Sequence, residues 1–167
     1  MTGIRVFRPE DCEGVRSVLW KTWIDSYSSF VPEKDLRSYY DEHYSPEALL
    51  RLMATTGTEG MVAESENSIV GVMIGKYDHK RSAYSVASLY ILPKEQGSGL
   101  GSRLLRLAEE RARSHALNEL YLGVMVQNTR SVEWYLRKGF TIQKEEPFAM
   151  GETEVPHYIM HLDISTS

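Results

Sequence analysis

Three closely spaced glycines could hold a phosphate group. Gly97, Gly99 and Gly101 alternate with Ser98 and Leu100, so this loop carries few side chains and a ligand can approach its backbone closely. The apolar pattern that follows predicts a helix, whose first backbone N–H groups have no partners within the helix. Those donors and the positive end of the helix dipole suit a phosphate or pyrophosphate.

The glycine spacing does not identify the ligand by itself. A Rossmann loop has the pattern G-x-G-x-x-G, and here the third glycine comes one residue early. A P-loop has Lys and then Ser or Thr after its last glycine, whereas Gly101 is followed by Ser102 and Arg103. The same pattern also fits a strand-to-helix turn that binds nothing.

Two longer stretches resemble the GNAT superfamily of acyltransferases. In the first, Leu89-Tyr90-Ile91 and Pro93 lead into the glycine loop and Leu104-Leu105, which resembles the acetyl-CoA motif of that family. In the second, Asn128 opens a predicted helix in which Tyr135 stands four residues before a Gly-Phe pair. Both stretches occur in the expected order, and the resemblance extends from residue 4 to residue 162.

The resemblance implies an acetyl-CoA-dependent N-acetyltransferase, with acetyl-CoA as co-substrate and no metal. The acceptor would be a primary amine on a polyamine-like or other small molecule, or on a peptide. Direct transfer is expected, because Cys12 lies outside both stretches. A looser resemblance to bacterial spermidine/spermine N-acetyltransferase-like members rests on Trp23, Tyr27, Phe148 and Met150. Aromatic and acidic side chains together would suit a polyamine.

The resemblance also implies roles for individual residues. Tyr135 is the expected general acid for the leaving thiolate, although it could also be an ordinary buried tyrosine. Asn128 can contact the coenzyme or cap its helix. Arg103, Arg137 and Lys138 can meet phosphates, but solvated helix charges are the simpler interpretation. The residues expected to bind acetyl-CoA are Leu89, Tyr90, Ile91, Gln96, Gly97, Ser98, Gly99, Leu100, Gly101, Ser102 and Asn128.

No general base is evident. Many relatives carry a glutamate on the strand before the glycine loop, whereas this chain has Ser85 and Ala87 there. The base is therefore another residue, with Asp78 and His79 as candidates, or water. The acidic residues considered for an acceptor cleft are Glu33, Asp35, Glu152 and Glu154. The histidines interpreted as structural, because they lack metal-ligand spacing, are His43, His115, His157 and His161.

Composition excludes several other classes. The chain has 167 residues, which predicts a single domain spanning 1–167. With 19 Lys and Arg against 23 Asp and Glu, a dedicated nucleic-acid binder is disfavoured. One cysteine, Cys12, cannot form an internal disulfide and fits a reducing compartment, so a cytoplasmic protein is expected. No signal peptide and no apolar run of ~18 residues is evident, so no membrane association is expected.

The periodicity predicts a mixed α/β (α+β) fold with a twisted, mostly antiparallel sheet flanked by helices. The GNAT resemblance implies the same fold, with two central strands that splay apart near residues 89–91 and 120–124. An exposed sheet edge at 158–162 could support a homodimer. The predicted strands are 4–6, 61–64, 69–74, 83–92, 120–124, 140–144 and 158–162, and the predicted helices are 12–27, 32–40, one starting at 46, 100–115 and 128–138.

Two other functions compete with the N-acetyltransferase. A nucleotide-binding oxidoreductase is opposed by the glycine spacing and by the absence of a Rossmann strand–helix repeat. A CoA-binding sensor or interaction module would use the same fold and the same ligand. The missing strand carboxylate favours the sensor, and turnover alone would separate it from an enzyme.

Overall fold

Seven strands form one continuous sheet in the computed structural model, which describes residues 2–165. The strand order is β1-β2-β3-β4-β5-β7-β6, and every neighbouring pair is antiparallel except β4 and β5. The expected mixed, mostly antiparallel sheet is therefore confirmed. The strands are β1 (Gly3–Val6), β2 (Thr58–Ser65), β3 (Ser68–Asp78), β4 (Ala83–Ile91), β5 (Glu119–Met125), β6 (Thr141–Met150) and β7 (Thr153–Asp163).

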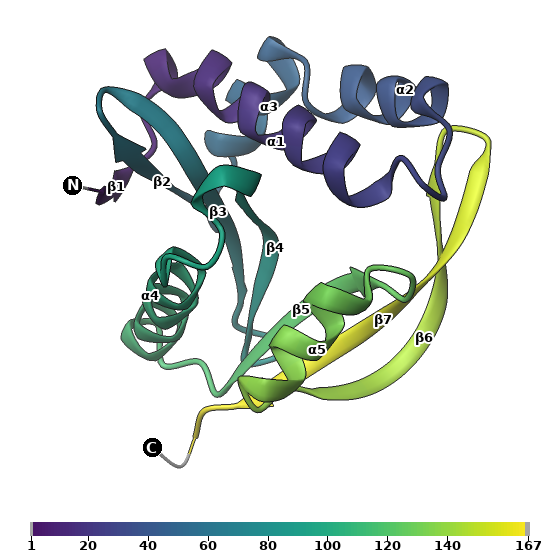
Figure 1. Ribbon diagram of the computed structural model, residues 1–167. Coiled ribbons are helices and arrows are strands. Elements are labelled where there is room, and N and C mark those ends of the chain that lie inside the picture. The colour runs from purple at the N-terminus through teal and green to yellow at the C-terminus, as the bar shows by residue number, and fades with distance from the viewer. Residues whose placement is uncertain (1, 166–167) are drawn as a thin grey trace.

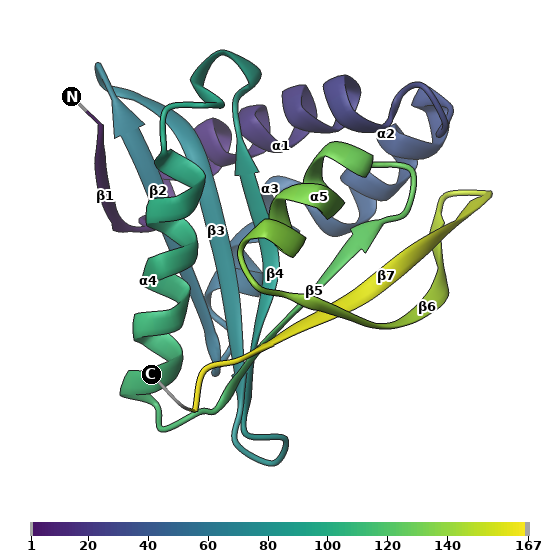
Figure 2. The same ribbon diagram turned by 60° about the horizontal axis from the view of Figure 1, so that its bottom comes forward.

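Five α-helices cover the two faces of this sheet. Helices α1 to α3 lie on one face, and α4 and α5 on the other (Figures 1 and 2). The apolar stripes predicted for α1 and α4 point inward, and Val15, Leu19 and Leu104 are fully buried. The helices are α1 (Cys12–Tyr27), α2 (Glu33–His43), α3 (Pro46–Met53), α4 (Leu100–Ser114) and α5 (Thr129–Arg137), with short 3₁₀ turns η1 (Pro9–Asp11) and η2 (Pro93–Glu95).

Strands β4 and β5 pair at one end only. Three residue pairs, from Ala83–Glu119 to Ser85–Tyr121, make the parallel ladder. Beyond Ser85 the two strands diverge, and β5 continues alongside β7 instead (Figure 2). The splayed central strands expected from the resemblance are thus present. They leave a wedge in the sheet, with backbone groups of β4 facing it.

The expected sheet edge at residues 158–162 is wrong. Strand β7 lies between β5 and β6 and pairs with both, so its backbone is not free to pair with a second copy. The edge strand on this side is β6, which is longer than the predicted 140–144. Strand β7 also begins earlier than the predicted residue 158, so only a turn at Gly151 and Glu152 separates β6 from β7.

Asp35 fastens the tip of the β6–β7 hairpin to α2. Its carboxylate accepts a hydrogen bond from the backbone N–H of Glu152 at 3.0 Å and another from the hydroxyl of Thr153. These bonds hold the pKa of Asp35 below its usual value, with the Thr153 hydroxyl as the largest cause. The hairpin tip therefore reaches across to the start of α2, as Figure 1 shows.

Two other features are absent from residues 2–165. No helix in this part of the chain combines the length and apolar character needed to cross a bilayer. No group of three or more His, Cys, Asp or Glu side chains in the same residues is placed to hold a metal ion.

Candidate active site

A cavity of about 720 Å³ occupies the wedge between β4 and β5. We call it the wedge cavity. The unpaired part of β4, the glycine loop, the end of α1 and the start of α5 surround it. It brings together ten of the twelve site residues expected from sequence, namely Leu89, Tyr90, Ile91, Gln96, Gly97, Gly99, Gly101, Ser102, Asn128 and Tyr135.

The other two expected residues do not line this cavity. The hydroxyl of Ser98 donates a hydrogen bond to the carbonyl of Glu95 at 2.7 Å and so shapes the loop. The side chain of Leu100 is buried in the core. Both residues contribute their backbone to the loop, so a role for their amides is unaffected by where their side chains lie.

The glycine loop is held open by local geometry. Gly97 and Gly99 have φ values of +85° and +87°, which residues with a side chain rarely adopt. The amide of Gln96 donates to the carbonyl of Ile91 at 3.0 Å, which ties the loop to the end of β4. Gly99 occupies the N-cap position of α4 without a side-chain cap, so the first N–H groups of α4 are available to a ligand.

The edge of β4 that faces the wedge is a second candidate binding element. From Val86 to Ile91 this edge has no partner strand, because β5 has already diverged. An extended, peptide-like ligand can pair with such an edge in the manner of an added strand. Residues 86–91 all line the cavity, so the edge leads from its centre to the glycine loop.

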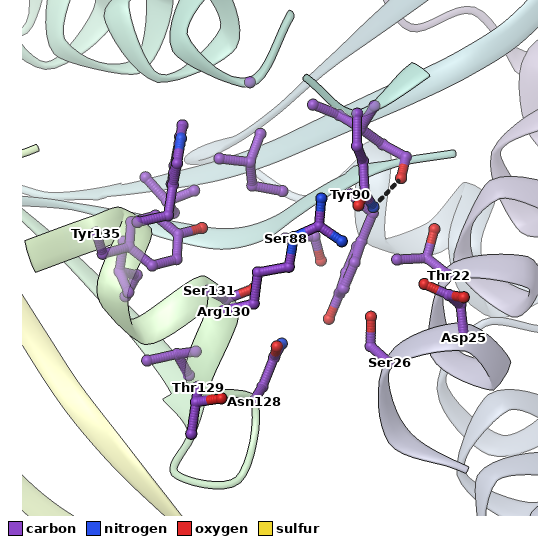
Figure 3. Close-up of a pocket in the computed structure, with 18 of the residues that line it drawn as sticks. Thr22, Asp25, Ser26, Ser88, Tyr90, Asn128, Thr129, Arg130, Ser131 and Tyr135 are labelled. Carbon is purple, nitrogen blue, oxygen red and sulfur yellow. Dashed lines mark hydrogen bonds between the residues drawn. The ribbon is translucent and has the colours of Figure 1, made fainter. Parts of the chain in front are cut away.

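Tyr135 lies on α5 with its hydroxyl directed into the cavity (Figure 3). Its side chain is mostly buried, and burial raises the pKa of the phenol above its usual value, with a smaller contribution from Tyr27. The phenol is therefore protonated at neutral pH, which is the form a proton donor needs. Asn128 occupies the N-cap position of α5 but makes no side-chain cap bond, so its amide is free to face the cavity.

Several lining residues were not predicted. Thr22, Asp25 and Ser26 project from α1 on one side, and Arg130 and Ser131 from α5 on the other (Figure 3). Only the fold brings these two helices to the same opening. The one available signal was the group of polar residues near the C-terminal end of α1.

Of the three cations considered in the sequence, only Arg137 lines the wedge cavity, and Arg130 was not considered. Arg130 and Arg137 line the cavity, both from α5. Arg103 instead donates to the carbonyl of Thr2 at 3.2 Å, and Lys138 lies 5.4 Å from the ring of Trp134. The wedge cavity thus has two guanidinium groups on α5 opposite the glycine loop, an arrangement that suits a polyphosphate.

A second cavity of about 250 Å³ continues from the wedge. We call it the aromatic cavity. Its walls come from α1, α2, β4, β5 and the β6–β7 hairpin. The six residues that line both cavities are Tyr27, Val86, Ala87, Tyr90, Gly123 and Val124. The remaining residues of the aromatic cavity are Trp23, Tyr39, Tyr44, Ser85, Met125, Phe148, Met150, His157 and Ile159.

Trp23 and Tyr27 contribute both to the hydrophobic core and to the aromatic cavity. Their side chains are 2% and 8% exposed, so they belong to the core. They also form the wall of the aromatic cavity, together with Tyr39, whose ring centroid lies 5.8 Å from that of Trp23. Burial raises the pKa of Tyr27, so this phenol stays neutral at physiological pH.

The candidate bases lie outside both cavities. The carboxylate of Asp78 accepts from the backbone N–H of Lys80 at 2.9 Å, which closes the β3–β4 turn, and His79 packs beside Tyr77. The acidic residues considered for the acceptor cleft are also elsewhere. Asp35 holds the hairpin tip, and the exposed residues Glu33, Glu152 and Glu154 line neither cavity.

Comparison with known proteins identifies the family. The model of the acetyltransferase (GNAT) family matches residues 17–140. The chain therefore belongs to the GNAT family of acetyltransferases, as the two sequence motifs predicted. An uncharacterized N-acetyltransferase encoded in the pepI 3′ region of Lactobacillus delbrueckii subsp. lactis is 20% identical, over 96% of this chain and 97% of that protein.

Solved structures share the fold. The PaiA N-acetyltransferase from Thermoplasma acidophilum in complex with coenzyme A superposes with a TM-score of 0.83 at 23% identity, covering 98% of this chain and 99% of that one. A spermidine N-acetyltransferase SpeG chimera from Vibrio cholerae and hSSAT gives a TM-score of 0.71 at 17% identity, covering 98% and 96%. At these identities the similarity establishes the overall fold.

Proposed function

We propose that this protein is an acetyl-CoA-dependent N-acetyltransferase that moves an acetyl group directly to a primary amine on a small molecule or peptide. The observation that supports this most is the wedge between β4 and β5. It joins an anion-binding loop at one end to an aromatic cavity at the other. A thioester carried on a long phosphorylated arm and an amine can therefore meet from opposite sides.

The donor half of the site suits acetyl-CoA. The N–H groups of residues 97–101 and the start of α4 would bind the pyrophosphate, with Arg130 and Arg137 opposite. The free edge of β4 would pair with the amide-containing arm, and the amide of Asn128 would contribute from α5. The structural similarity to a protein crystallised with coenzyme A agrees with this assignment.

The reaction requires two proton transfers and stabilisation of an oxyanion. The amine nitrogen attacks the thioester carbonyl, and a backbone N–H of β4 near Ile91 would stabilise the negative oxygen. Collapse breaks the C–S bond, and Tyr135 would protonate the departing sulfur. The raised pKa of this buried phenol keeps the proton on it until the thiolate forms. No covalent enzyme intermediate is needed.

We further propose that residues 1–167 act as one catalytic domain in the cytoplasm. The single cysteine, Cys12, has no partner for an internal disulfide, which fits a reducing compartment. The net charge of −4 disfavours a nucleic-acid partner and leaves an amine-bearing metabolite or peptide as the acceptor.

A CoA-binding sensor remains the second candidate function. The observation that favours it is a missing carboxylate. Ser85 and Ala87 line the aromatic cavity at the positions where many relatives carry a glutamate. A sensor would bind acetyl-CoA in the same wedge but would not turn it over.

Thiol release from acetyl-CoA separates the two functions. The protein is incubated with polyamines, amino acids, aminoglycosides, arylalkylamines and short peptides, and free thiol and N-acetylated product are both quantified. The enzyme predicts saturable release with at least one class, and initial rates that depend on both substrates together. Tight binding of acetyl-CoA without release from any amine would contradict catalysis and favour the sensor.

A further inference from the structure

His157 lies in the aromatic cavity although its sequence context suggested a structural role. It belongs to β7, and its half-buried ring packs against Phe148 at 5.2 Å between centroids. A methyl group built on Gly123 would lie 2.9 Å from Cδ2 and 3.3 Å from Nε2 of this ring. Gly123 lines both cavities, so the imidazole lies beside the junction where the acetyl group and the amine would meet.

The contacts of the His157 ring indicate which of its nitrogens carries the hydrogen and which carries the lone pair. Nδ1 lies 2.7 Å from the backbone carbonyl oxygen of Glu146. A carbonyl oxygen only accepts hydrogen bonds, so Nδ1 carries the hydrogen. In the neutral ring, Nε2 then holds the lone pair, on the side that faces Gly123. The carboxylate of Glu146 is paired with Lys144 at 3.3 Å, on the exposed edge strand.

No other side chain of the aromatic cavity is suited to take a proton. Among its lining residues in the described chain there is no Asp, Glu or Lys. The tyrosines face the cavity as neutral phenols, and burial, with smaller contributions from Tyr44 and Glu42, raises the pKa of Tyr39 to about 12. His43 stacks on Tyr39 at 4.2 Å between centroids but does not line the cavity. Histidine is the side chain that normally exchanges protons between about pH 5 and 8.

The same lining restricts the acceptor. Aromatic rings favour the first ammonium group through their faces and bind an apolar body by burial. A second ammonium group inside the cavity would have no carboxylate partner among the described lining residues, and an unpaired buried charge is costly. A volume of about 250 Å³ fits a body of roughly one ring.

We propose that the acceptor is a primary amine on an apolar or aromatic body without a second positive charge, bound in the aromatic cavity, and that Nε2 of His157 removes its proton. This assignment deepens the proposed function and rests on it. His157 thus takes the role for which residues 85 and 87 offer no carboxylate.

The proton and electron balance is complete. The ammonium group gives one proton to solvent before attack. The nitrogen lone pair forms the C–N bond, and the remaining excess proton on nitrogen passes to Nε2 of His157. The C–S electron pair leaves with sulfur, which takes the phenolic proton of Tyr135. Exchange with solvent returns His157 and Tyr135 to their starting forms, and the products are the N-acetyl amine and CoA.

Variants of His157 test the base, with His161 as a matched control. His161 is on the same strand four residues further on, but it stacks on Tyr121 outside both cavities. With 2-phenylethylamine as acceptor, H157A is expected to lower kcat by ~100-fold or more, whereas H161A keeps most of it. Calorimetry should show unchanged acetyl-CoA affinity. Added imidazole and related azoles should restore turnover of H157A, more strongly as the azole becomes more basic.

Each outcome for His157 decides its role. Wild-type turnover in both H157A and H157Q would overturn the base. So would a loss that azoles fail to restore, because it would make the ring a packing residue. If H157A does not fold, judged by circular dichroism, H157Q retains a polar side chain of similar length. A loss of kcat in H157Q without a change in acetyl-CoA affinity would then support the base.

The acceptor class is tested with three amines and a binding measurement. We expect kcat/KM for 2-phenylethylamine to exceed that for 1,4-diaminobutane and spermidine by ~10-fold or more. In the presence of CoA, 2-phenylethylamine should also bind measurably by calorimetry. Preference for a diamine would overturn the inference while leaving the proposed N-acetyltransferase intact. Acetylation of no amine at all would contradict both.

Discussion

The two cavities open from the same wedge, but the residues that line them differ in chemical character. The wedge cavity is lined by backbone groups, glycines and two arginines of α5, so backbone hydrogen bonds and positive charge would make most contacts with a ligand. The aromatic cavity is lined by rings and thioethers and, among its described lining residues, by no carboxylate. They meet at Gly123, beside the free edge of β4. In our proposal, the donor site is therefore encoded by a compact motif, whereas the acceptor site draws on six separate elements, α1, α2, β4, β5, β6 and β7.

The largest effect is expected at Tyr135, which lines the wedge cavity. Tyr135→Phe removes the phenolic proton while keeping the ring, and should lower kcat by ~100-fold or more with little change in acetyl-CoA affinity. Stopped-flow thiol release and calorimetry measure the two quantities. Tyr121→Phe, which changes a tyrosine outside both cavities, is the control. Equal turnover of the Tyr135 variant and the wild type would refute its role as acid.

The second substitution should weaken the binding of acetyl-CoA alone. Gly99 has a φ of +87°, so Gly99→Val forces a branched residue into a conformation it disfavours. We expect acetyl-CoA to bind ~10- to 100-fold more weakly, since such strain costs about 1–3 kcal/mol. Gly3→Val is the control, because Gly3 is on β1 in open space. Unchanged acetyl-CoA affinity in the Gly99 variant would show that the loop does not bind the coenzyme.

The third substitution should weaken the binding of the amine alone. Tyr39→Leu removes a ring that packs against Trp23 and Phe148 at 5.8 and 5.6 Å. The KM for the amine should rise by ~3- to 10-fold, the range expected for one aromatic contact, while the acetyl-CoA affinity stays the same. A change confined to acetyl-CoA binding would mean that the division between the cavities is wrong.

Arg137→Gln should have the reverse selectivity of Tyr39→Leu, because it should affect acetyl-CoA binding and not amine binding. Its expected effect is smaller. Arg137 is exposed on α5 at the wedge cavity. Losing its charge should weaken acetyl-CoA binding by ~2- to 5-fold, as for exposed ion pairs, and should reduce the salt dependence of that binding. The KM for the amine should not move. Calorimetry at low and high salt provides the measurement, and an effect that is equal at both would argue against a phosphate contact.

The smallest expected effect concerns Asp35, which holds the tip of the β6–β7 hairpin. The pKa of Asp35 is lowered in the folded protein, so its contribution to stability is present above the unfolded value near ~3.9 and is lost as pH falls through the folded value. Asp35→Asn should therefore lower Tm at pH 7, and the difference from wild type should shrink toward pH 3. Glu33→Gln, on the same helix and exposed, should change little at either pH.

The residues proposed for the donor half of the site could be recognised in the sequence because they lie in local motifs. The glycine loop and Tyr135 stand in short strings whose spacing reflects one strand, one turn and one helix each, and the structure places both in the wedge cavity. The strand order is not encoded in this way. Periodicity marks β7 as a strand but does not reveal its neighbours, so residues 158–162 were expected at an edge and instead lie between β5 and β6.

The acceptor half was not predictable because it depends on how distant segments meet. Asp35 was considered for the acceptor cleft, but the fold places the hairpin tip beside it and its carboxylate is used there. His157 shares its strand and its face with His161, and sequence gives no reason to separate them. The fold distinguishes them: His157 lines the aromatic cavity beside Gly123, whereas His161 stacks on Tyr121 outside both cavities.

A crystal structure with a bisubstrate conjugate would test the central claim most directly. The conjugate joins the sulfur of CoA through an acetyl group to the nitrogen of 2-phenylethylamine. Our account predicts the pyrophosphate on residues 97–101, the arm along the free edge of β4, the acetyl carbonyl beside Gly123 and the phenyl ring among Trp23, Tyr39 and Phe148. A conjugate bound with its ring outside the aromatic cavity, or with its pyrophosphate away from the glycine loop, would contradict it.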